Sequence, residues 1–362
     1  MNLLLDMIFH YDYILFNMKI TDIETYILVA DNLDPSLTSS AQDTCLVIVK
    51  TDEGIEGYGE TDTNPWVAKA YIESPTTHTM DQCIKEMLIG SNPLNIEDLW
   101  TKMYVGKAMT GRRGAGVNAM SAIDMALWDI KGKYENKPVF ELLGGKKQDY
   151  VIPYASLQPV GHSFQEYKDS LVAWAIRAKE LGFKAVKSEV TLNGPYAHSG
   201  LNENDERTTE VVAAVRNALG PEIKLMIDVQ YRWHDAEAAL KTVKDWGQYD
   251  IYFLETPVWT DDINSYARMH DEAPMKIAAG EWLSTRYEFE DLIINGKIDV
   301  AQPDIGRCGG LTEALKIAEF SQLHNRIIVP HCWKTSVSIT ATAHFAFNTP
   351  NCAFIEYLPP QL

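Results

Sequence analysis

Two different hydrophobic patterns divide the chain near residue 150. Between Met18 and about residue 62, apolar and polar positions alternate in three runs rich in β-branched residues, at 20–30, 44–50 and 55–60. This alternation predicts an antiparallel meander. Residues 64–135 have a helical pattern instead, clearest at 115–133, where apolar residues recur every three or four positions. The first part of the chain is therefore predicted to be α+β.

After residue 150, short β-branched runs alternate with amphipathic helical segments. The predicted strands are residues 151–156, 185–189, 224–228, 251–255, 276–280, 300–304, 326–331 and 353–356. Helical patterns such as 166–181, 208–219 and 311–323 lie between them. This alternation predicts βαβ units with a parallel sheet, and eight strands favour a closed barrel. An open doubly wound sheet is the alternative; the lack of a Gly-rich nucleotide turn after any early strand disfavours it.

The predicted organisation is an α+β domain at residues 18–150 and a barrel at 151–356. Residues 1–17 are apolar and are interpreted as an N-terminal extension, with an extra strand or an oligomer contact as alternatives. They contain no early Lys or Arg and no small-residue cleavage site, so a secretory signal is not expected. No uncharged run reaches the ~20 residues that span a bilayer.

Composition and net charge limit the partners and the compartment that we expect for this protein. Hydrophobic residues make up 46% of the 362 positions, and the formal net charge is −18. Such a charge repels nucleic acids and anionic membranes, which we exclude as main partners. A small-molecule carboxylate substrate would need local positive charge from a metal ion or a buried lysine. The five cysteines are an odd number without a CxxC motif, which indicates free thiols in a reducing compartment, the cytoplasm.

A charged or titratable residue ends each of seven consecutive predicted strands. These residues are Lys187 and Glu189 on one strand, then Asp228, Glu255, Glu281, Asp304, His331 and Glu356. Successive members lie one βα unit apart, which places them on the C-terminal face of a barrel, where active sites lie. A lone acid at a strand end is more often a helix N-cap. The repeated placement is what indicates a site.

Asp228, Glu255 and Glu281 are the predicted metal ligands. Clustered carboxylates repel each other and raise each other's pKa, and a bound cation removes this penalty. Oxygen ligands without Cys or His favour Mg²⁺ over zinc. Binding a substrate carboxylate to such an ion stabilises the enediolate that forms when the α-proton is removed.

His331 is the predicted base, since a base with a pKa near neutrality is needed. Asp304 would orient it; alternatively, Asp304 caps a helix and His331 bonds a backbone carbonyl. Lys187 would bind a substrate carboxylate oxygen. Glu356 would have to be protonated, with a raised pKa, to donate a hydrogen bond to the same oxygen.

Together these residues resemble the enolase superfamily, mandelate racemase subgroup, over nearly the whole chain from Met18. The motifs are AMSAIDMALWDIKGK with KPVFELLGG, then IDV, LET, AGE, QPDIGRCGG and VPH. The resemblance implies a modified (β/α)7β TIM barrel and an N-terminal α+β capping domain completed by the C-terminal tail. It also implies an essential Mg²⁺ at the three acids, a His331–Asp304 dyad, Glu356 as an electrophile, and a homo-oligomer, dimeric or octameric.

One departure from the subgroup's pattern affects the predicted reaction. Its racemases carry Lys-x-Lys on the second barrel strand, whereas this chain has Lys187-Ser188-Glu189. Racemisation needs a base on each face, which disfavours it here, with Glu189 as the alternative second base. We therefore expect one-base chemistry: dehydration of a sugar acid, an aldonate or aldarate, to a 2-keto-3-deoxy acid, and the resemblance implies a 2R substrate. The alternatives are a racemase, epimerase or cycloisomerase of the superfamily, and a non-catalytic binding barrel.

The proton donor for the leaving hydroxyl and the substrate contacts are less constrained. Gln230 stands where some relatives have a histidine, so His331 itself or His198 is the candidate donor; His198 is alternatively a solvated loop residue. Loops 31–43 and 61–68 are expected to face the mouth, and the first is polar enough to suit a polyol. Further expected pocket residues are Arg232, Tyr196, Trp333 and the lid residue Trp66, whose alternative is packing between domains.

Overall fold

The computed structural model describes residues 18–35 and 39–359. The predicted N-terminal extension, residues 1–17, lies outside the described residues. All five cysteines are buried free thiols. No helix in the described part of the chain is both long enough and apolar enough to cross a membrane.

The first part of the chain is a three-stranded antiparallel sheet covered by helices, as the pattern predicts. The strands are β1 (Ile20–Val29), β2 (Asp43–Thr51) and β3 (Glu56–Thr61), in the order β1-β2-β3. The helices are α1 (Pro65–Glu73), α2 (Ile84–Leu88), α3 (Ile96–Gly106), α4 (Ala108–Gly111), α5 (Ala115–Glu135) and α6 (Val139–Leu142). We call these elements the capping domain.

Helix α5 packs directly on β3 because two glycines of that strand leave room for its backbone. A Cβ atom at Gly57 would lie 2.0 Å from the carbonyl oxygen of Ala126, and one at Gly59 would lie 1.9 Å from that of Ala122. Asn136 ends the helix in the left-handed conformation, with φ of 51°. The long apolar helix of the sequence pattern is thus buried against the sheet.

The second part is a barrel of eight parallel strands. They are β4 (Pro153–Leu157), β5 (Ala185–Glu189), β6 (Lys224–Asp228), β7 (Ile251–Glu255), β8 (Lys276–Ala279), β9 (Val300–Ala301), β10 (Ile327–Ile328) and β11 (Ile355–Tyr357). The order is β10-β9-β8-β7-β6-β5-β4-β11, and a parallel bridge between Ile328 and Cys352 joins the two ends. The predicted TIM-barrel class is therefore confirmed.

Helices surround the strands, and buried side chains fill the interior. The helices are α7 (Phe164–Glu180), α8 (Asp205–Leu219), α9 (Ala236–Val243), α10 (Ile263–Glu272), α11 (Thr285–Ile294), α12 (Gly310–Leu323) and α13 (Ser336–Asn348). Short 3-10 turns lie at Ser40–Gln42, His198–Gly200 and Lys244–Tyr249. The interior cluster is Tyr154, Ala185, Met226, Phe253, Ala278, Val300, Val329 and Phe354. The barrel is thus a packed core, and its chemistry lies at the mouth.

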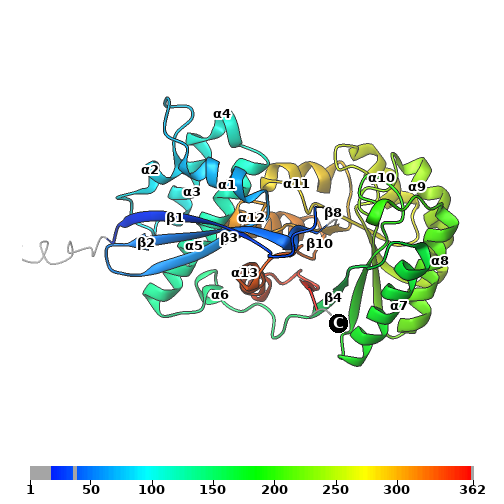
Figure 1. The fold of residues 1–362 in the computed structure, drawn as a ribbon. Helices are drawn as coiled ribbons and strands as arrows, with labels where there is room; N and C mark the ends of the chain where they lie inside the picture. Colours follow the sequence, from blue (N-terminus) through cyan, green and yellow to red (C-terminus); the bar gives the residue numbers. More distant parts are fainter. Residues whose placement is uncertain (1–17, 36–38, 360–362) are drawn as a thin grey trace, which may run out of the picture.

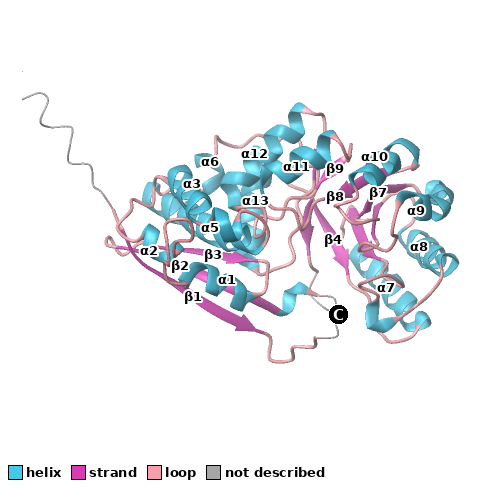
Figure 2. Cartoon of the chain, turned by 90° about the horizontal axis from the view of Figure 1, so that it is seen from above, coloured by secondary structure: helices cyan, strands magenta, loops and turns pink. Residues whose placement is uncertain are grey.

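The capping domain lies beside one side of the barrel. Figure 1 shows β1–β3 with α1–α6 at one end of the molecule and α7–α10 at the other, and Figure 2 shows the same separation from above. Helix α12 packs on α5, and α13 contacts β3. The loops that precede α12 and α13 therefore lie where the two parts meet.

Three barrel strands end earlier than the sequence pattern predicts. β8, β9 and β10 stop before Glu281, Asp304 and His331, which lie in the following loops. The residue before each of these side chains explains the difference. Gly280 has φ of 120°, which breaks the strand, and prolines at positions 303 and 330 have no N–H to donate to the ladder.

Candidate active site

The register of the parallel strands brings acidic side chains together at the barrel mouth. Glu189 pairs with Asp228 across β5 and β6, and Asp228 pairs with Glu255 across β6 and β7. Glu281 follows β8. The four residues are between 0% and 5% exposed. Four buried carboxyl groups on neighbouring strands require either protons or cations to balance their charge.

Lys187 is the cation that the chain itself supplies among these acids. Its Nζ lies 2.7 Å from Glu255 Oε1, 2.9 Å from Glu356 Oε1 and 4.0 Å from Asp228 Oδ2. The side chain is 3% exposed. Lys187 is thus placed as the sequence predicts, at the floor of the mouth.

The predicted metal ligands remain short of positive charge despite this lysine. Burial, with repulsion from neighbouring acids, raises the pKa of Asp228 to about 6 and that of Glu255 to about 7. Burial also raises the pKa of Glu281. A divalent cation would favour the ionised form of all three carboxylates.

Neighbouring groups orient each of the three carboxylates. Thr256 Oγ1 donates to Asp228 Oδ1 at 2.9 Å, Gln302 Nε2 donates to Glu255 Oε2 at 2.5 Å, and Tyr231 OH donates to Glu281 Oε1 at 3.2 Å. Three fixed, buried oxygen donors with unbalanced negative charge match the preferences of Mg²⁺. The residues present therefore fit the metal that the sequence predicts.

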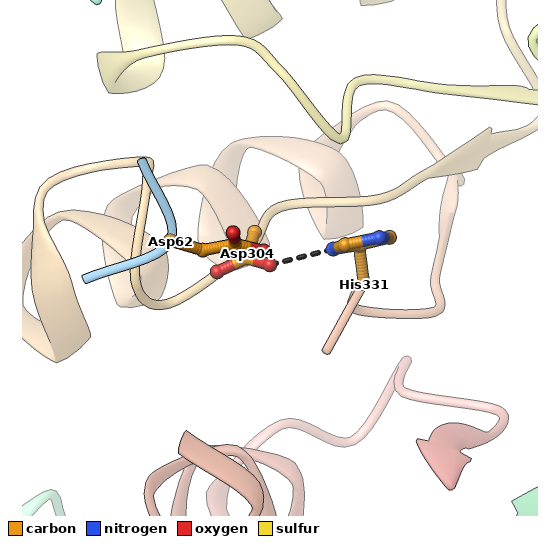
Figure 3. Close-up of side chains that lie close together, drawn as sticks. All are labelled: Asp62, Asp304 and His331. Carbon is orange, nitrogen blue, oxygen red and sulfur yellow. Dashed lines mark hydrogen bonds and ion pairs between the residues drawn. The ribbon is translucent and has the colours of Figure 1, made fainter. Parts of the chain in front are cut away.

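Figure 3 shows a second group of side chains that could bind a metal, Asp62, Asp304 and His331. Ligand atoms of Asp62, Asp304 and His331 lie within 4.8 Å of one another. Asp62 is already neutralised: its Oδ2 lies 2.7 Å from Arg307 Nη2, and its Oδ1 lies 3.2 Å from Lys334 Nζ. Because the chain supplies these cations, the carboxylate triad fits a metal better than this group does.

His331 and Asp304 form the predicted dyad. His331 Nδ1 lies 2.6 Å from Asp304 Oδ2, and both residues are buried. His331 Nε2 lies 3.3 Å from Glu281 Oε2, so it points toward the metal ligands. Burial disfavours the charged imidazole, but Glu356, Asp304 and Glu281 outweigh it and raise the pKa of His331 to about 9.

That pKa is higher than the near-neutral value expected from the sequence. The cause is the number of acids around the ring, which favour the imidazolium. A cation bound at Glu281 would offset part of this negative field and lower the pKa toward neutrality.

The expectation that Glu356 is protonated is wrong for this structure. Burial acts to raise its pKa, but Lys187, His331 and the backbone N–H of Cys332 outweigh burial and lower the pKa to about 2. Cys332 N donates to Glu356 Oε2 at 2.9 Å. Glu356 is therefore placed as the ion-pair partner of Lys187.

The mouth opens into a pocket that contains most of the predicted site residues. Its lining is Ser40, Ser156, Lys187, Glu189, Tyr196, Asp228, Gln230, Glu281, Trp282, Arg307, His331 and Trp333. Ser40 belongs to loop 31–43, which was expected to face the mouth, whereas Ser156, Trp282 and Arg307 were not predicted. Trp282 and Arg307 follow Glu281 and Asp304 by one and three residues, and their closeness to predicted strand ends was the available signal.

Glu189 occupies the place of the second racemase lysine. Its Oε1 accepts a hydrogen bond from Thr191 Oγ1 at 3.1 Å. Burial, with the nearby Asp228, raises the pKa of Glu189 to about 8. The side chain lines the same pocket as His331.

Three predicted site residues lie away from this pocket. Arg232 Nη2 pairs with Asp205 Oδ1 at 2.6 Å, and the two residues before it, Gln230 and Tyr231, have positive φ of 42° and 61°. Trp66 is 54% exposed on α1 and lines a separate surface hollow with Tyr71 and Lys107. His198 is buried, with Nε2 2.9 Å from the carbonyl oxygen of Gly161. None of them contacts the described pocket, so their predicted roles there are corrected.

The capping domain holds both loops that carry the dyad. On the loop after β9, Asn118 Nδ2 donates to the Arg307 carbonyl at 2.7 Å, and Gly309 N donates to Ser121 Oγ at 2.9 Å. On the loop after β10, Lys334 Nζ donates to the Ser40 carbonyl and, at 2.6 Å, to that of Asp43. The active-site mouth is therefore built jointly by the two parts of the chain.

Comparisons with known proteins agree with this architecture. Residues 23–144 match the mandelate racemase/muconate lactonizing enzyme N-terminal domain, and residues 170–362 match the enolase C-terminal domain-like family. The chain is 33% identical to a D-galactarolactone cycloisomerase of Agrobacterium fabrum, over 95% of this chain and 86% of the relative. It is 31% identical to a D-galactonate dehydratase of Pectobacterium atrosepticum, over 94% and 81%.

A solved structure is similar over the same extent. The 3,6-anhydro-D-galactonate cycloisomerase from Zobellia galactanivorans superposes with a TM-score of 0.81 at 33% identity, covering 95% of this chain and 88% of that one. The two matched family domains span both the capping sheet and the barrel. The chain therefore belongs to the enolase superfamily, in the mandelate racemase subgroup.

Proposed function

We propose that this chain is a Mg²⁺-dependent dehydratase of a sugar acid, which removes the C2 proton and eliminates the 3-hydroxyl to give a 2-keto-3-deoxy acid. The observation that carries the proposal is a single His–Asp dyad, with Nδ1 and Oδ2 2.6 Å apart, facing a cluster of buried carboxylates. The D-galactonate dehydratase among the relatives supports the reaction class.

Each residue at the site has its own role in the proposed reaction. Lys187 binds an oxygen of the substrate carboxylate, and Asp304 holds the imidazole so that Nε2 of His331 takes the C2 proton. When bound at Asp228, Glu255 and Glu281, Mg²⁺ would stabilise the negative charge that develops on the substrate carboxylate. Glu356 keeps Lys187 protonated and in place through their 2.9 Å ion pair.

Elimination then needs a proton for the leaving oxygen. As the C2=C3 bond forms and the C3–O bond breaks, His331 returns its proton to the departing hydroxyl, which leaves as water. The enol product tautomerises to the 2-keto acid. Gln230 lines the pocket but cannot donate a proton usefully, and His198 lies elsewhere, so His331 serves as both base and acid. The 2R configuration implied by the family resemblance stays a prediction.

Cycloisomerisation is the second candidate, because two of the relatives are named cycloisomerases. In a 3,6-anhydro acid the oxygen on C3 belongs to a ring. The same proton removal at C2 then opens the ring, and the leaving oxygen stays in the product. The site chemistry is shared, and only the leaving group differs.

The deciding experiment is a substrate screen in D₂O with Mg²⁺. Aldonic, aldaric, lactone and 3,6-anhydro acids are incubated with the enzyme, 2-keto acids are detected with semicarbazide, and product mass is measured. Loss of one water indicates dehydration, and unchanged mass with a 2-keto acid indicates cycloisomerisation. Deuterium entering C2 with both configurations recovered, and no keto acid formed, would identify a racemase or epimerase and overturn the proposal.

A further inference from the structure

The pocket continues outward from the reacting groups toward the capping domain. This outer pocket shares Ser40, Trp282 and Arg307 with the inner one. Its other polar walls are Ser39, Gln42, Asp43, Asp62, Thr63, Asn64 and Asn118. A substrate whose carboxylate lies at Lys187 would extend its distal end into this space. The charges of the side chains that line the outer pocket would therefore determine which distal groups the substrate can carry.

Positive charge is scarce in both pockets. Among the described lining residues the cationic side chains are Lys187, Arg307 and His331. Lys187 lies at the floor, between Glu255 and Glu356, and His331 belongs to the dyad. Arg307 alone borders the outer pocket as a cation.

Arg307 is already paired. Its Nη2 lies 2.7 Å from Asp62 Oδ2, its Nε donates to the Asp62 carbonyl at 3.0 Å, and its Nη1 donates to the Glu281 carbonyl at 3.2 Å. Lys334, just behind the wall, is 2% exposed and pairs with Asp43 Oδ1 at 3.1 Å and with Asp62 Oδ1 at 3.2 Å. Both cations are thus balanced by two capping-domain aspartates.

The described loop residues that line the outer pocket, within 33–35, 39–43 and 62–64, include Asp43 and Asp62 and no lysine or arginine. Residues 31–43 and 61–68 contain no lysine or arginine, and they contain the aspartates Asp31, Asp34, Asp43 and Asp62. Arg307 and Lys334 are already balanced by Asp43 and Asp62, so a distal carboxylate would lose its hydration there without gaining a free cationic partner among the described lining residues. Hydroxyl groups, by contrast, need no counter-ion and can exchange hydrogen bonds with the side chains of Thr63, Asn64 and Asn118.

We propose that the substrate carries one carboxylate, at the reacting end, and an uncharged polyhydroxy distal end, so that it is an aldonate or an anhydro or lactone form of a sugar acid rather than an open-chain aldarate. This inference rests on the proposed elimination, because that reaction places the single carboxylate at Lys187. The sequence left both an aldonate and an aldarate open as substrates, and this inference favours the aldonate.

The test compares acids that differ only in the oxidation state of C6: D-galactonate with galactarate, and D-gluconate with D-glucarate. We expect kcat/KM to favour the aldonate at least about 100-fold within any pair that turns over, as expected when a buried charge finds no partner. An aldarate turned over equally well or better would overturn the inference while leaving the proposed elimination standing.

Binding separates the two proposals if no pair turns over. Calorimetry with Mg²⁺ present would then show tighter binding of the aldonate if the inference holds, although the proposed reaction would have failed. Binding of the dicarboxylate as tightly as the monocarboxylate, or binding of neither, would overturn the inference.

A charge-gain variant tests the location of the distal end. Thr63 lines the outer pocket. Thr63→Lys should lower the aldonate-to-aldarate ratio of kcat/KM at least about 10-fold, because it supplies the missing partner charge. Thr63→Gln, of similar length without charge, should keep the wild-type preference. An unchanged ratio in Thr63→Lys would show that the distal end lies elsewhere and overturn the inference.

Discussion

At the scale of single residues, protonation at this site is set by distances between side chains from different strands. Lys187 stays charged between Glu255 and Glu356, and Glu356 stays ionised because it also accepts the Cys332 N–H. The ring of His331, held by Asp304, can both take and return a proton near the metal ligands. Its imidazole is therefore the side chain whose loss should stop the reaction.

Replacing His331 with asparagine tests this role. His331→Asn keeps a polar side chain beside Asp304 but cannot accept the C2 proton, so turnover and C2–H exchange should fall about 10³-fold or more. Exchange is measured by NMR in D₂O and turnover with semicarbazide. His234→Asn, at a side chain 84% exposed, is the matched control and should behave as wild type. Turnover within tenfold of wild type in His331→Asn would remove His331 as the base.

Metal binding should be visible in stability as well as in activity. Asp228, Glu255 and Glu281 are buried with unbalanced charge, so Mg²⁺ should stabilise the folded state. At a hundredfold excess over Kd, the free energy of unfolding should rise by about 2.7 kcal/mol, and Tm should rise with it. Differential scanning fluorimetry after EDTA treatment and Mg²⁺ titration measures this shift. Asp228→Asn should reduce the shift strongly. An equal shift in that variant would place the ion elsewhere.

At the scale of elements, the dyad depends on the fit between capping domain and barrel. Helix α5 binds the loop after β9 through Asn118 and Ser121, and Lys334 ties the loop after β10 to Ser40 and Asp43. Glu60 of β3 accepts backbone N–H bonds at the start of α13. These contacts fix the loops that carry Asp304 and His331.

Lys334→Met measures the strength of the second contact. The change leaves the buried carboxylate of Asp62 and the half-buried carboxylate of Asp43 without their shared cation, so the free energy of unfolding should fall by about 3 kcal/mol. Urea titration gives this value. Lys137→Met removes an exposed pair with Glu135 and should cost less than about 1 kcal/mol. Similar losses in the two variants would contradict a special role for Lys334.

At the scale of the whole molecule, the net charge of −18 works against compactness. Like charges spread over the surface repel one another, and salt screens that repulsion: the screening length falls from about 30 Å at 0.01 M to about 10 Å at 0.1 M. The free energy of unfolding should therefore rise when NaCl is raised over this range without divalent ions. Urea titrations at both concentrations check it. A fall would mean that local ion pairs outweigh the net repulsion.

The homo-oligomer implied by the family resemblance also belongs to this scale. It stays a prediction, which light scattering of the purified protein tests directly. Assembly would be expected to proceed in spite of the net charge, so its extent should also increase with salt.

Much of the fold and site followed from local patterns. The spacing of strand-end residues placed Lys187, Asp228, Glu255 and His331 at one barrel mouth, because strand register in a parallel barrel repeats with each βα unit. The predicted strands were too long at β8, β9 and β10, because glycine or proline interrupts the hydrogen-bond ladder there.

The sequence by itself determined the fold class and the residue types at the mouth, since periodicity and spacing are local properties of the chain, and its motifs carried the resemblance to the superfamily. Only the tertiary structure decided that Arg232 and Trp66 lie outside the pocket, that Glu356 pairs with Lys187, and that the cations at the outer pocket are already paired among its described residues. The physical reason is that side-chain direction and charge balance depend on distances between segments far apart in sequence, which no local pattern records.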